Sequence, residues 1–398
     1  QLRDLANLAW SFAMLEHHVP QNLVPRISDL LLACKGMHTS VDVGHQQRGQ
    51  DAASILSLLW AWSFVQTRGS ESPGPEILCL GKNCLQMIGR GCDSRQGKGH
   101  EGDKFVSKDS GPGVLHVHRP MPGSLERQGV AEAAGPQIVQ ELVDRLVLYK
   151  PHGWEVDQKE NCASVRKLTS YLRSHFPRRR FPLLYDSSSM HGFLHRLDIP
   201  SSGLILVAKT YEAFYDLMFQ LHTGVLLRDY IVLCHGWVPP SVQELTARIL
   251  WVASAGSSNP SKVLPHHLAA GKPATSQLKV LAHLVRERPY SLVGIRIRTG
   301  RRHQIRVQLA NIGHPIVSDH KYANRGHVVG ATEGAKSQSH AWRGPGVENW
   351  CPQTFLHRYR LQFHDTNHVH EAHSQLPEDL QRALSLLAIR HDQSDFNR

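Results

Sequence analysis

The sequence predicts an α+β domain with a largely antiparallel mixed sheet, preceded by a small all-α repeat region and a disordered linker. Apolar residues recur at helical spacing over residues 1–66, but this periodicity is lost over residues 67–136, where small, polar and basic residues dominate. From residue 137, short apolar strands outnumber helices and alternate with them irregularly, which argues against a βαβ order. We therefore predict a helical repeat region at 1–66, a flexible basic linker at 67–136 and the main domain at 137–390.

Length and composition indicate a globular chain with a polyanionic partner. The 398 residues are 41% hydrophobic, enough for a sizeable core, and carry a formal net charge of +11. Basic surface attracts nucleic acid or anionic lipid. No apolar run reaches the roughly 20 residues of a membrane-spanning helix, and no basic amphipathic helix stands out as a lipid anchor. Nucleic acid is therefore the expected partner, and no membrane is expected.

Cysteine and histidine patterns give little support for a metal site. The seven cysteines are an odd, scattered set, which favours reduced thiols inside a cell. Cys79, Cys84 and Cys92 lie close together, but their intervals are not the paired Cys-x-x-Cys knuckles of zinc sites. The cluster from His368 to His373 lacks the His-Glu-x-x-His spacing of a metal-dependent hydrolase. We expect no metal.

The first 66 residues contain two similar tryptophan-bearing segments. Leu-Ala-Trp-Ser-Phe at residues 8–12 is similar to Leu-Leu-Trp-Ala-Trp-Ser-Phe at residues 58–64. Helical pairs that recur with such a signature are typical of an α-solenoid, and the segment is similar to short helical repeats of organellar RNA-binding proteins. The alternative is a plain helical hairpin with buried tryptophans. Within the predicted linker, the apolar island at 77–88 is interpreted as a leftover helix of the repeat region.

The main domain is organised around residues 192–209. Asp198 lies between the basic pair His195-Arg196 and a Pro-Ser-Ser-Gly turn, which leads into the apolar run 204–208. This pattern predicts a loop that feeds a buried strand. A carboxylate on such a loop, with cations to keep it ionised, suits a nucleophile or a general base. The alternative is an aspartate that only caps a turn.

Several segments of the main domain resemble, in the right order, the motifs of the RluA family of RNA pseudouridine synthases. The catalytic motif of that family resembles His195-Arg196-Leu197-Asp198, followed by Ser-Ser-Gly-Leu and Ala-Lys. The resemblance covers about residues 140–388. The other matching segments are Asp144–Gly153, Arg228–Tyr230 with Gly236, Gly271–Ala274, Thr299–Arg306, Gly313–Asp319 with Tyr322, Leu356–His357 and Leu376–Leu380.

The resemblance implies a catalytic domain with the pseudouridine synthase fold, which isomerises specific uridines of ribosomal or transfer RNA without a cofactor. The buried uridine would have to be flipped into a pocket. Asp198 would be the catalytic carboxylate, as a nucleophile or as a base, and Arg306 would be its charge partner. Tyr230 would stack on the flipped uracil and could relay a proton. Arg196 would occupy the space that the base vacates or bind a phosphate.

Further residues of the motifs are expected to bind the substrate. Lys150, Arg301 and His303 are assigned to phosphate contacts or to loop architecture, and His195 and Leu356 complete the predicted set. The chain also departs from the family pattern. Arginine replaces lysine at 228 and a threonine at 302, serine replaces threonine at 201, and Gln353-Thr354 replaces the usual Arg-Gln pair.

Two alternatives from other classes remain beside the enzyme. One is an inactive synthase that serves as an RNA-binding or RNA-chaperone protein, although a pure binder has no need of Asp198, which would repel phosphate. The other is the metal-dependent hydrolase considered above. We expect an intracellular location, in a mitochondrion or plastid or otherwise in the cytoplasm or nucleus, and no obligatory protein partner. Because the chain begins at Gln1 within a helical pattern, we expect its true N-terminus to be missing.

Overall fold

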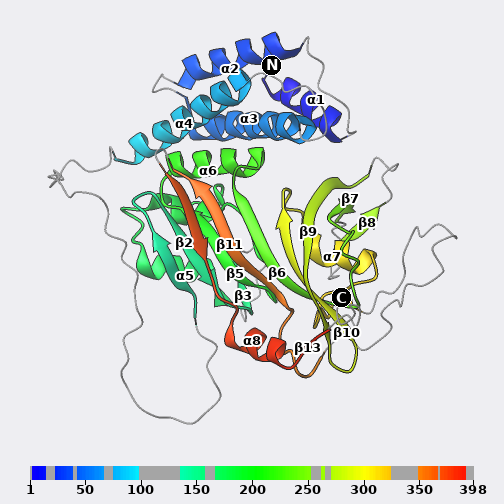
Figure 1. The fold of residues 1–398 in the computed structure, drawn as a ribbon. Helices are drawn as coiled ribbons and strands as arrows, with labels where there is room; N and C mark the ends of the chain where they lie inside the picture. Colours follow the sequence, from blue (N-terminus) through cyan, green and yellow to red (C-terminus); the bar gives the residue numbers. More distant parts are fainter. Residues whose placement is uncertain are drawn as a thin grey trace.

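A computed structural model gives the fold of the chain (Figure 1). It describes residues 2–14, 23–38, 43–66, 75–97, 135–156, 166–251, 261–264, 270–323, 348–365 and 368–390. None of the helices in these ranges is long and apolar enough to cross a membrane.

A large twisted sheet forms the centre of the molecule. Its eleven strands follow the order β1-β2-β5-β11-β6-β10-β9-β7-β8, with β12 beside β11 and β13 beside β9. Strands β5 and β11 pair in parallel, and the remaining pairs of this sheet are antiparallel. The strands are β1 (Gln137–Glu141), β2 (Arg145–Lys150), β5 (Ser202–Ala208), β6 (Leu227–His235), β7 (Glu244–Leu250), β8 (Lys262–Leu264), β9 (Lys272–Val285), β10 (Pro289–Ile297), β11 (Leu356–His364), β12 (Val369–His373) and β13 (Ala388–Ile389). The predicted α+β fold with a largely antiparallel mixed sheet is confirmed.

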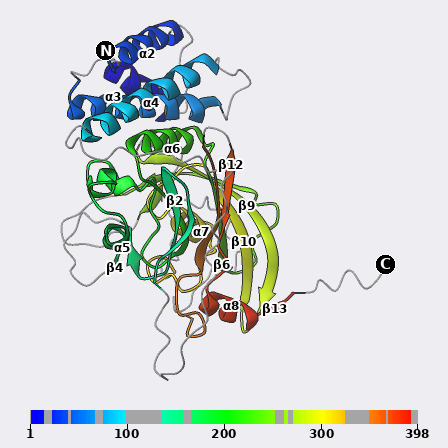
Figure 2. The ribbon, with the colours of Figure 1, turned by 90° about the vertical axis from the view of Figure 1, so that its left-hand side faces the viewer.

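Helices cover this sheet and build a separate layer at the N-terminus. Figures 1 and 2 show the layer of α1–α4 on the side of α6 that faces away from the sheet, with α3 and α4 packed directly against α6. The helices are α1 (Leu2–Met14), α2 (Val24–His38), α3 (His45–Gln66), α4 (Pro75–Gly97), α5 (Leu168–His175), α6 (Tyr211–Thr223), α7 (Gln304–Asn311) and α8 (Glu378–Ser385). Strands β3 (Trp154–Glu155) and β4 (Arg166–Lys167) form a small sheet of their own. The predicted all-α region is present, whereas its repeat character stays a prediction.

Helix α4 corrects the predicted start of the linker. Its 23 residues lie inside the segment 67–136, which we expected to be flexible, and they extend the apolar island well beyond residue 88. Ile77, Cys84, Ile88 and Cys92 are buried on one face, at helical spacing. Glycines and basic residues between these positions hide the apolar stripe in the sequence. Residues 98–134 of the predicted linker lie outside the described part of the chain.

The N-terminal helices share a hydrophobic core with the catalytic domain. One cluster of buried residues joins α1–α4 with α6 and with one face of β2, β5 and β11. A Cβ atom on Gly89 of α4 would lie 2.6 Å from the Cα atom of Glu212 on α6, so the close approach of the two helices requires glycine. Asp93 accepts hydrogen bonds from the backbone N–H groups of Tyr211 and Glu212, both at 3.0 Å, at the start of α6. The helical layer is therefore docked on the catalytic domain.

Candidate active site

A buried lysine donates hydrogen bonds to the backbone of the loop that carries Asp198. Lys150, the last residue of β2, has no exposed surface, and its Nζ donates to the carbonyl oxygens of Pro151 at 2.9 Å, Ile199 at 3.3 Å and Ser201 at 2.7 Å. Burial lowers the pKa of this ammonium group to about 7. All three donors of Lys150 are used on backbone carbonyls, two of them in the Asp198 loop, so this geometry fits loop architecture and leaves no donor for a phosphate.

Asp198 and Arg306 form the ion pair that the motifs predict. Nη1 of Arg306, in the first turn of α7, donates to Oδ2 of Asp198 at 2.9 Å. Nε and Nη2 of the same guanidinium donate to the two oxygens of Asp319, each at 2.7 Å. Asp319 is fully buried. Two of the three nitrogens of Arg306 are thus fixed by Asp319, and the third is directed at Asp198.

Asp198 remains ionised because its charged neighbours outweigh its burial. Burial alone would raise the pKa of this carboxyl, whereas His303, Arg306 and Lys150 lower it, and the net shift is downward. The side chain still has 24% of its surface exposed, so the carboxylate can be approached. A carboxylate that is ionised, oriented and accessible can act as a nucleophile or as a general base.

His303 is the second neighbour of the carboxylate. Its Nε2 lies 3.8 Å from Oδ1 of Asp198, and its Nδ1 lies 2.8 Å from the hydroxyl oxygen of Tyr322. The Tyr322 ring also packs under the guanidinium of Arg306, with 5.2 Å from Cζ to the ring centre. Burial lowers the pKa of His303 to about 4, so its imidazole is neutral near pH 7. His303 therefore positions this corner of the site without adding a full charge.

A buried arginine that sequence reasoning missed connects the predicted tyrosine to the loop. Arg358, on β11, donates from Nε to the hydroxyl oxygen of Tyr230 at 2.9 Å and from Nη1 to the carbonyl oxygen of Leu204 at 3.0 Å. Its Nη2 reaches both the Tyr230 hydroxyl and the carbonyl oxygen of Arg196, the latter at 3.3 Å. These contacts place the Tyr230 hydroxyl beside the backbone of Arg196, two residues before Asp198.

The same arginine determines the protonation of His195. Nη1 of Arg358 lies 2.7 Å from Nδ1 of His195, and because arginine has no acceptor, Nδ1 must be the acceptor. Burial and the charge of Arg358 hold the pKa of His195 well below its usual range, so the neutral ring carries its proton on Nε2. That buried Nε2–H group has no hydrogen-bond partner among the described residues.

Arg358 and Asp319 were missed for different reasons. Arg358 directly follows the matched pair Leu356-His357, and an arginine on a strand is usually solvated. Here its side chain is only 1% exposed, because the Asp198 loop and β6 pack over it. A glycine at 203 is part of this packing, since a Cβ atom there would lie 2.3 Å from the carbonyl oxygen of Arg358. Asp319 ends a motif that we matched, and its contact with Arg306 could have been proposed as a charge pair.

The remaining predicted residues occupy two kinds of position. Leu356 is buried in the apolar cluster that also holds Tyr230, whereas the Arg196 side chain is exposed at the loop. Arg301 donates from Nε to the carbonyl oxygen of Pro273 at 2.9 Å and lies over the ring of Trp60, outside the Asp198 cluster itself. The structure thus brings Asp198, Arg306 and His303 together, with Tyr230 next to the same loop.

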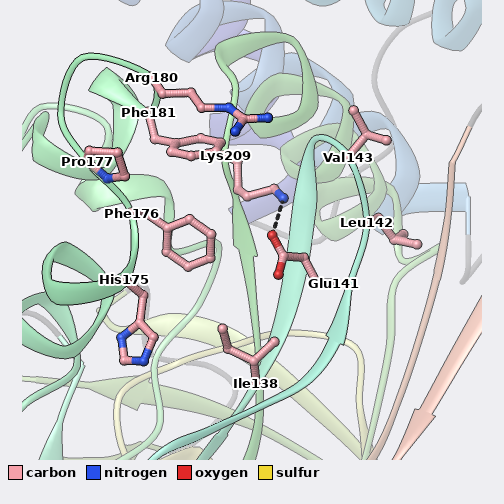
Figure 3. A pocket seen from close by; sticks show the side chains of 10 residues that line it. All are labelled: Ile138, Glu141, Leu142, Val143, His175, Phe176, Pro177, Arg180, Phe181 and Lys209. Carbon is pink, nitrogen blue, oxygen red and sulfur yellow. Dashed lines mark hydrogen bonds and ion pairs between the residues drawn. The ribbon is translucent and has the colours of Figure 1, made fainter. Parts of the chain in front are cut away.

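A cavity on the flank of the sheet lies apart from these residues. It has a volume of about 600 Å³ and lies between the β1–β2 hairpin and the segment that follows α5 (Figure 3). Lys209 projects into it, ion-paired with Glu141 at 2.8 Å and lying over two phenylalanine rings. None of the predicted site residues lines this cavity. Its lining residues are Ile138, Glu141, Leu142, Val143, His175, Phe176, Pro177, Arg180, Phe181 and Lys209.

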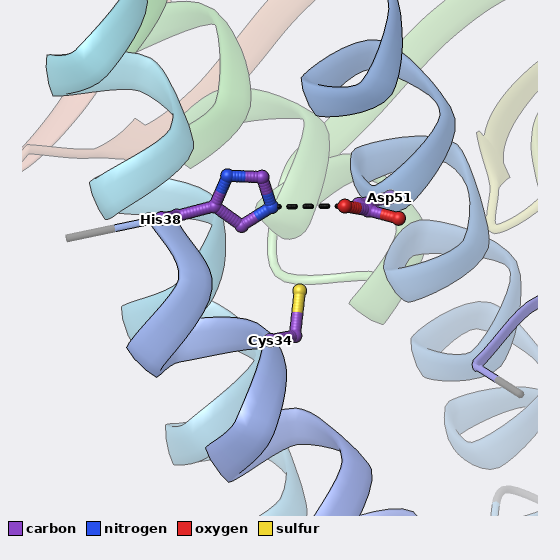
Figure 4. A group of neighbouring side chains, drawn as sticks. All are labelled: Cys34, His38 and Asp51. Carbon is purple, nitrogen blue, oxygen red and sulfur yellow. Dashed lines mark hydrogen bonds and ion pairs between the residues drawn. The ribbon is translucent and has the colours of Figure 1, made fainter. Parts of the chain in front are cut away.

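One group of side chains in the described part of the chain has the chemistry of metal ligands, and it lies in the N-terminal layer. Cys34 and His38 on α2 meet Asp51 on α3, with one ligand atom of each within 4.8 Å of the others (Figure 4). Nε2 of His38 is hydrogen-bonded to Oδ2 of Asp51 at 3.0 Å. Burial raises the pKa of the Cys34 thiol to about 12, which disfavours the thiolate that binds metals. The arrangement is a histidine–aspartate pair beside a thiol, and Nδ1 of His38 is buried without a hydrogen-bond partner among the described residues.

Comparisons with known proteins indicate the class of enzyme that the chain resembles. The family model described as RNA pseudouridylate synthase matches residues 144–311. Ribosomal large subunit pseudouridine synthase D of Yersinia pestis is 29% identical over 263 residues, which cover 65% of this chain and 72% of that protein. The protein of the same name from Neisseria meningitidis is 31% identical over 200 residues, covering 50% of this chain and 48% of that protein.

A solved structure, human RNA pseudouridylate synthase domain containing 1, is 21% identical with a TM-score of 0.45, and the match covers 68% of this chain and 96% of that one.

The family match over residues 144–311, which include Asp198 and Arg306, indicates an enzyme of the RNA pseudouridylate synthase class. Within this class, the chain is similar to the RluA family of RNA pseudouridine synthases. It is therefore an isomerase that acts on RNA uridine, and the inactive-binder and hydrolase alternatives have no support from the comparisons.

Proposed function

We propose that this chain converts specific uridines of ribosomal or transfer RNA to pseudouridine, with Asp198 as the catalytic carboxylate and without a cofactor. The observation that carries this proposal is the ionised Asp198 carboxylate on its rigid loop, oriented by an arginine that is itself fixed by a buried aspartate. The bacterial relatives are named as pseudouridine synthases of the ribosomal large subunit, which supports ribosomal RNA as one of the two substrates.

The reaction is an isomerisation, so its atoms balance without a co-reactant. The bond between the ribose and the uracil nitrogen breaks, the base turns over, and the ribose bonds to carbon five of the uracil. The proton that carbon five loses is matched by the proton that the freed nitrogen gains. Asp198 can serve either as the nucleophile that holds the sugar or base, or as a base that removes a ribose proton.

The surrounding residues are assigned to holding the flipped nucleotide. Tyr230 stacks on the uracil, and because Arg358 donates two hydrogen bonds to its hydroxyl, that hydroxyl is left to act as a donor. His195 acts on the nucleotide indirectly, through its contact with Arg358, because its own Nε2–H group is buried. Arg196, exposed on the same loop, fills the space that the base vacates. Each of these groups acts by position, whereas Asp198 carries the chemistry.

The test is pseudouridine formation by Asp198→Asn protein in a buffer that contains EDTA. Asparagine keeps the size of the side chain but removes its charge, so turnover should be abolished while RNA binding persists. The matched control is Glu244→Gln, which neutralises an exposed carboxylate on β7 and should leave turnover unchanged. Wild-type turnover by folded Asp198→Asn protein would refute the assignment. An absolute requirement of the wild-type enzyme for a divalent ion would refute the cofactor-free reaction.

We further propose an intracellular site of action, in a compartment that contains the substrate RNA: a mitochondrion or plastid, or else the cytoplasm or nucleus. The supporting observation is that Cys34, Cys84, Cys234 and Cys351 are buried thiols outside any disulfide, which fits a reducing environment. Imaging of the tagged full-length protein in its native cell tests this placement, and a secreted protein would contradict it.

A further inference from the structure

Three tryptophans from three different elements each carry a basic side chain over the ring. Arg302 lies 4.6 Å from the ring centre of Trp251, which directly follows β7. Arg301 lies 5.2 Å from the ring centre of Trp60 on α3, and Lys272 lies 5.9 Å from that of Trp10 on α1. We call these six residues, Trp10, Trp60, Trp251, Lys272, Arg301 and Arg302, the tryptophan platform.

The positive charge of the platform is not neutralised by the protein. In the part of the chain that the structure describes, no carboxylate forms an ion pair with Lys272, Arg301 or Arg302. Burial lowers the pKa of Arg301 to about 10, so its guanidinium still carries its charge at neutral pH. Three cations beside aromatic rings, without acidic partners, form a surface that attracts a polyanion.

The platform begins next to the candidate active site. Arg301 and Arg302 directly precede His303, whose Nε2 lies 3.8 Å from Asp198. Because consecutive Cα atoms are about 3.8 Å apart, the Cα atoms of Arg301 and Arg302 lie within about 8 Å of that of His303. Trp251 is 45% exposed and Arg302 is exposed as well, so this end of the platform is open to a ligand.

A buried arginine fixes the end of α1 beside the strands that carry the rest of the platform. Arg248, a buried residue of β7, donates from Nη1 to the carbonyl oxygen of Met14 at the end of α1, at 2.7 Å. It also donates to the carbonyl oxygens of Ala270 and Gly271, just before Lys272. One arginine therefore connects the end of α1 to the two strands that present Trp251 and Lys272.

We propose that the tryptophan platform binds the single-stranded stretch of substrate RNA next to the target uridine, with one base stacked on Trp251 and the adjoining phosphates held by Arg302 and Lys272. The inference rests on the proposed function for the identity of the RNA. Aromatic rings interleaved with cations are the usual surface for single-stranded nucleic acid, because every base has a face for stacking and every linkage a negative charge. RNA binding at the tryptophan platform gives the docked N-terminal helices a part in recognising the substrate.

The test measures the Kd of full-length protein for a fluorescein-labelled single-stranded RNA by fluorescence anisotropy. Trp251→Ala should raise the Kd by about tenfold or more through the loss of a stacked base, and Trp251→Phe should restore most of the affinity. Arg302→Gln should weaken binding and reduce the slope of log Kd against log salt by about one.

The chain offers a matched control in Trp237→Ala. Trp237 is 39% exposed and lies under Arg390, 3.9 Å from Cζ to the ring centre. Its Nε1 donates to the carbonyl oxygen of Leu284, at the end of β9 opposite to Lys272. About twelve residues of strand separate these two positions, which corresponds to about 40 Å. This control should bind RNA as tightly as the wild type.

The outcomes distinguish the platform from the proposed function. If the wild type forms pseudouridine but Trp251→Ala binds RNA as tightly as the wild type, the platform is wrong and the enzyme assignment stands. If the wild type binds RNA through Trp251 but forms no pseudouridine, the platform stands and the proposed function fails. Equal losses in Trp251→Ala and Trp237→Ala, or binding through Trp251 to anionic phosphatidylserine vesicles but not to RNA, would overturn the platform.

Discussion

Asp319→Asn tests whether the second carboxylate of Arg306 is needed to build the site. Asp319 is fully buried and accepts two 2.7 Å hydrogen bonds from Arg306, whereas an asparagine at this position could accept only through its carbonyl oxygen while its amide faces a donor. Breaking a buried ion pair costs about 3–5 kcal/mol. We expect the lower end, about 3 kcal/mol, because Arg306 keeps its contact with Asp198.

This loss should appear in both stability and catalysis. On the scale of a domain of 150–250 residues, about 3 kcal/mol lowers the Tm by roughly 6–12 °C, measured by circular dichroism. Without Asp319, Arg306 still contacts Asp198 but is no longer fixed in one orientation, and misplacement of a reacting group by about 1 Å costs about 10²-fold in rate. The turnover of folded Asp319→Asn protein should fall by about that factor.

Glu371→Gln is the matched control for this prediction. Glu371 accepts from Nε and Nη2 of Arg360 at 2.7 and 3.0 Å, in the same two-bond geometry, but the glutamate side chain is 40% exposed. Exposed pairs contribute about 0–1 kcal/mol, so the control should unfold almost as the wild type does. The reasoning fails if Asp319→Asn and Glu371→Gln lose the same stability, or if Asp319→Asn retains full turnover.

Two further predictions concern the charge partner and the N-terminal helices. Arg306→Met should be severely impaired near pH 7 and recover partly as the pH rises, because the pKa of Asp198 rises when the cation is removed and the carboxylate ionises only at higher pH; a pH–rate profile with an unshifted acidic limb would contradict this. Deletion of residues 1–97 should abolish soluble folded protein, because it exposes Tyr215 and Phe219 of α6 to solvent. A truncated chain that is monomeric and unfolds cooperatively would refute the shared core.

Much of the site could be predicted from the sequence because its chemistry is local. The loop around Asp198 lies directly before a strand whose seven residues are all buried, and both the turn residues and the apolar run are visible in the sequence. The partner Arg306 lies 108 positions away, and only the family resemblance connected it to Asp198. The largely antiparallel pairing of the strands followed from their irregular alternation with helices.

The tertiary structure decided which charged residues are buried. Lys150, Arg358 and Asp319 look like solvated residues of strand ends and loops, and the elements that cover them are distant in sequence. A local pattern records which residues are apolar, but burial of a charge depends on the partners that fold over it.

The packing of the N-terminal helices on the catalytic domain was also decided only by the tertiary structure. The sequence determined that α1, α2 and α3 are helices, through their apolar spacing, and it indicated a basic chain with nucleic acid as the expected partner. The sequence did not show that α4 belongs to the helical region, because glycines and basic residues interrupt its apolar stripe. Nor did it show that α4 packs on α6, because the two helices are more than a hundred residues apart in the sequence. Docking depends on two complementary surfaces, and that complementarity exists only once both have folded.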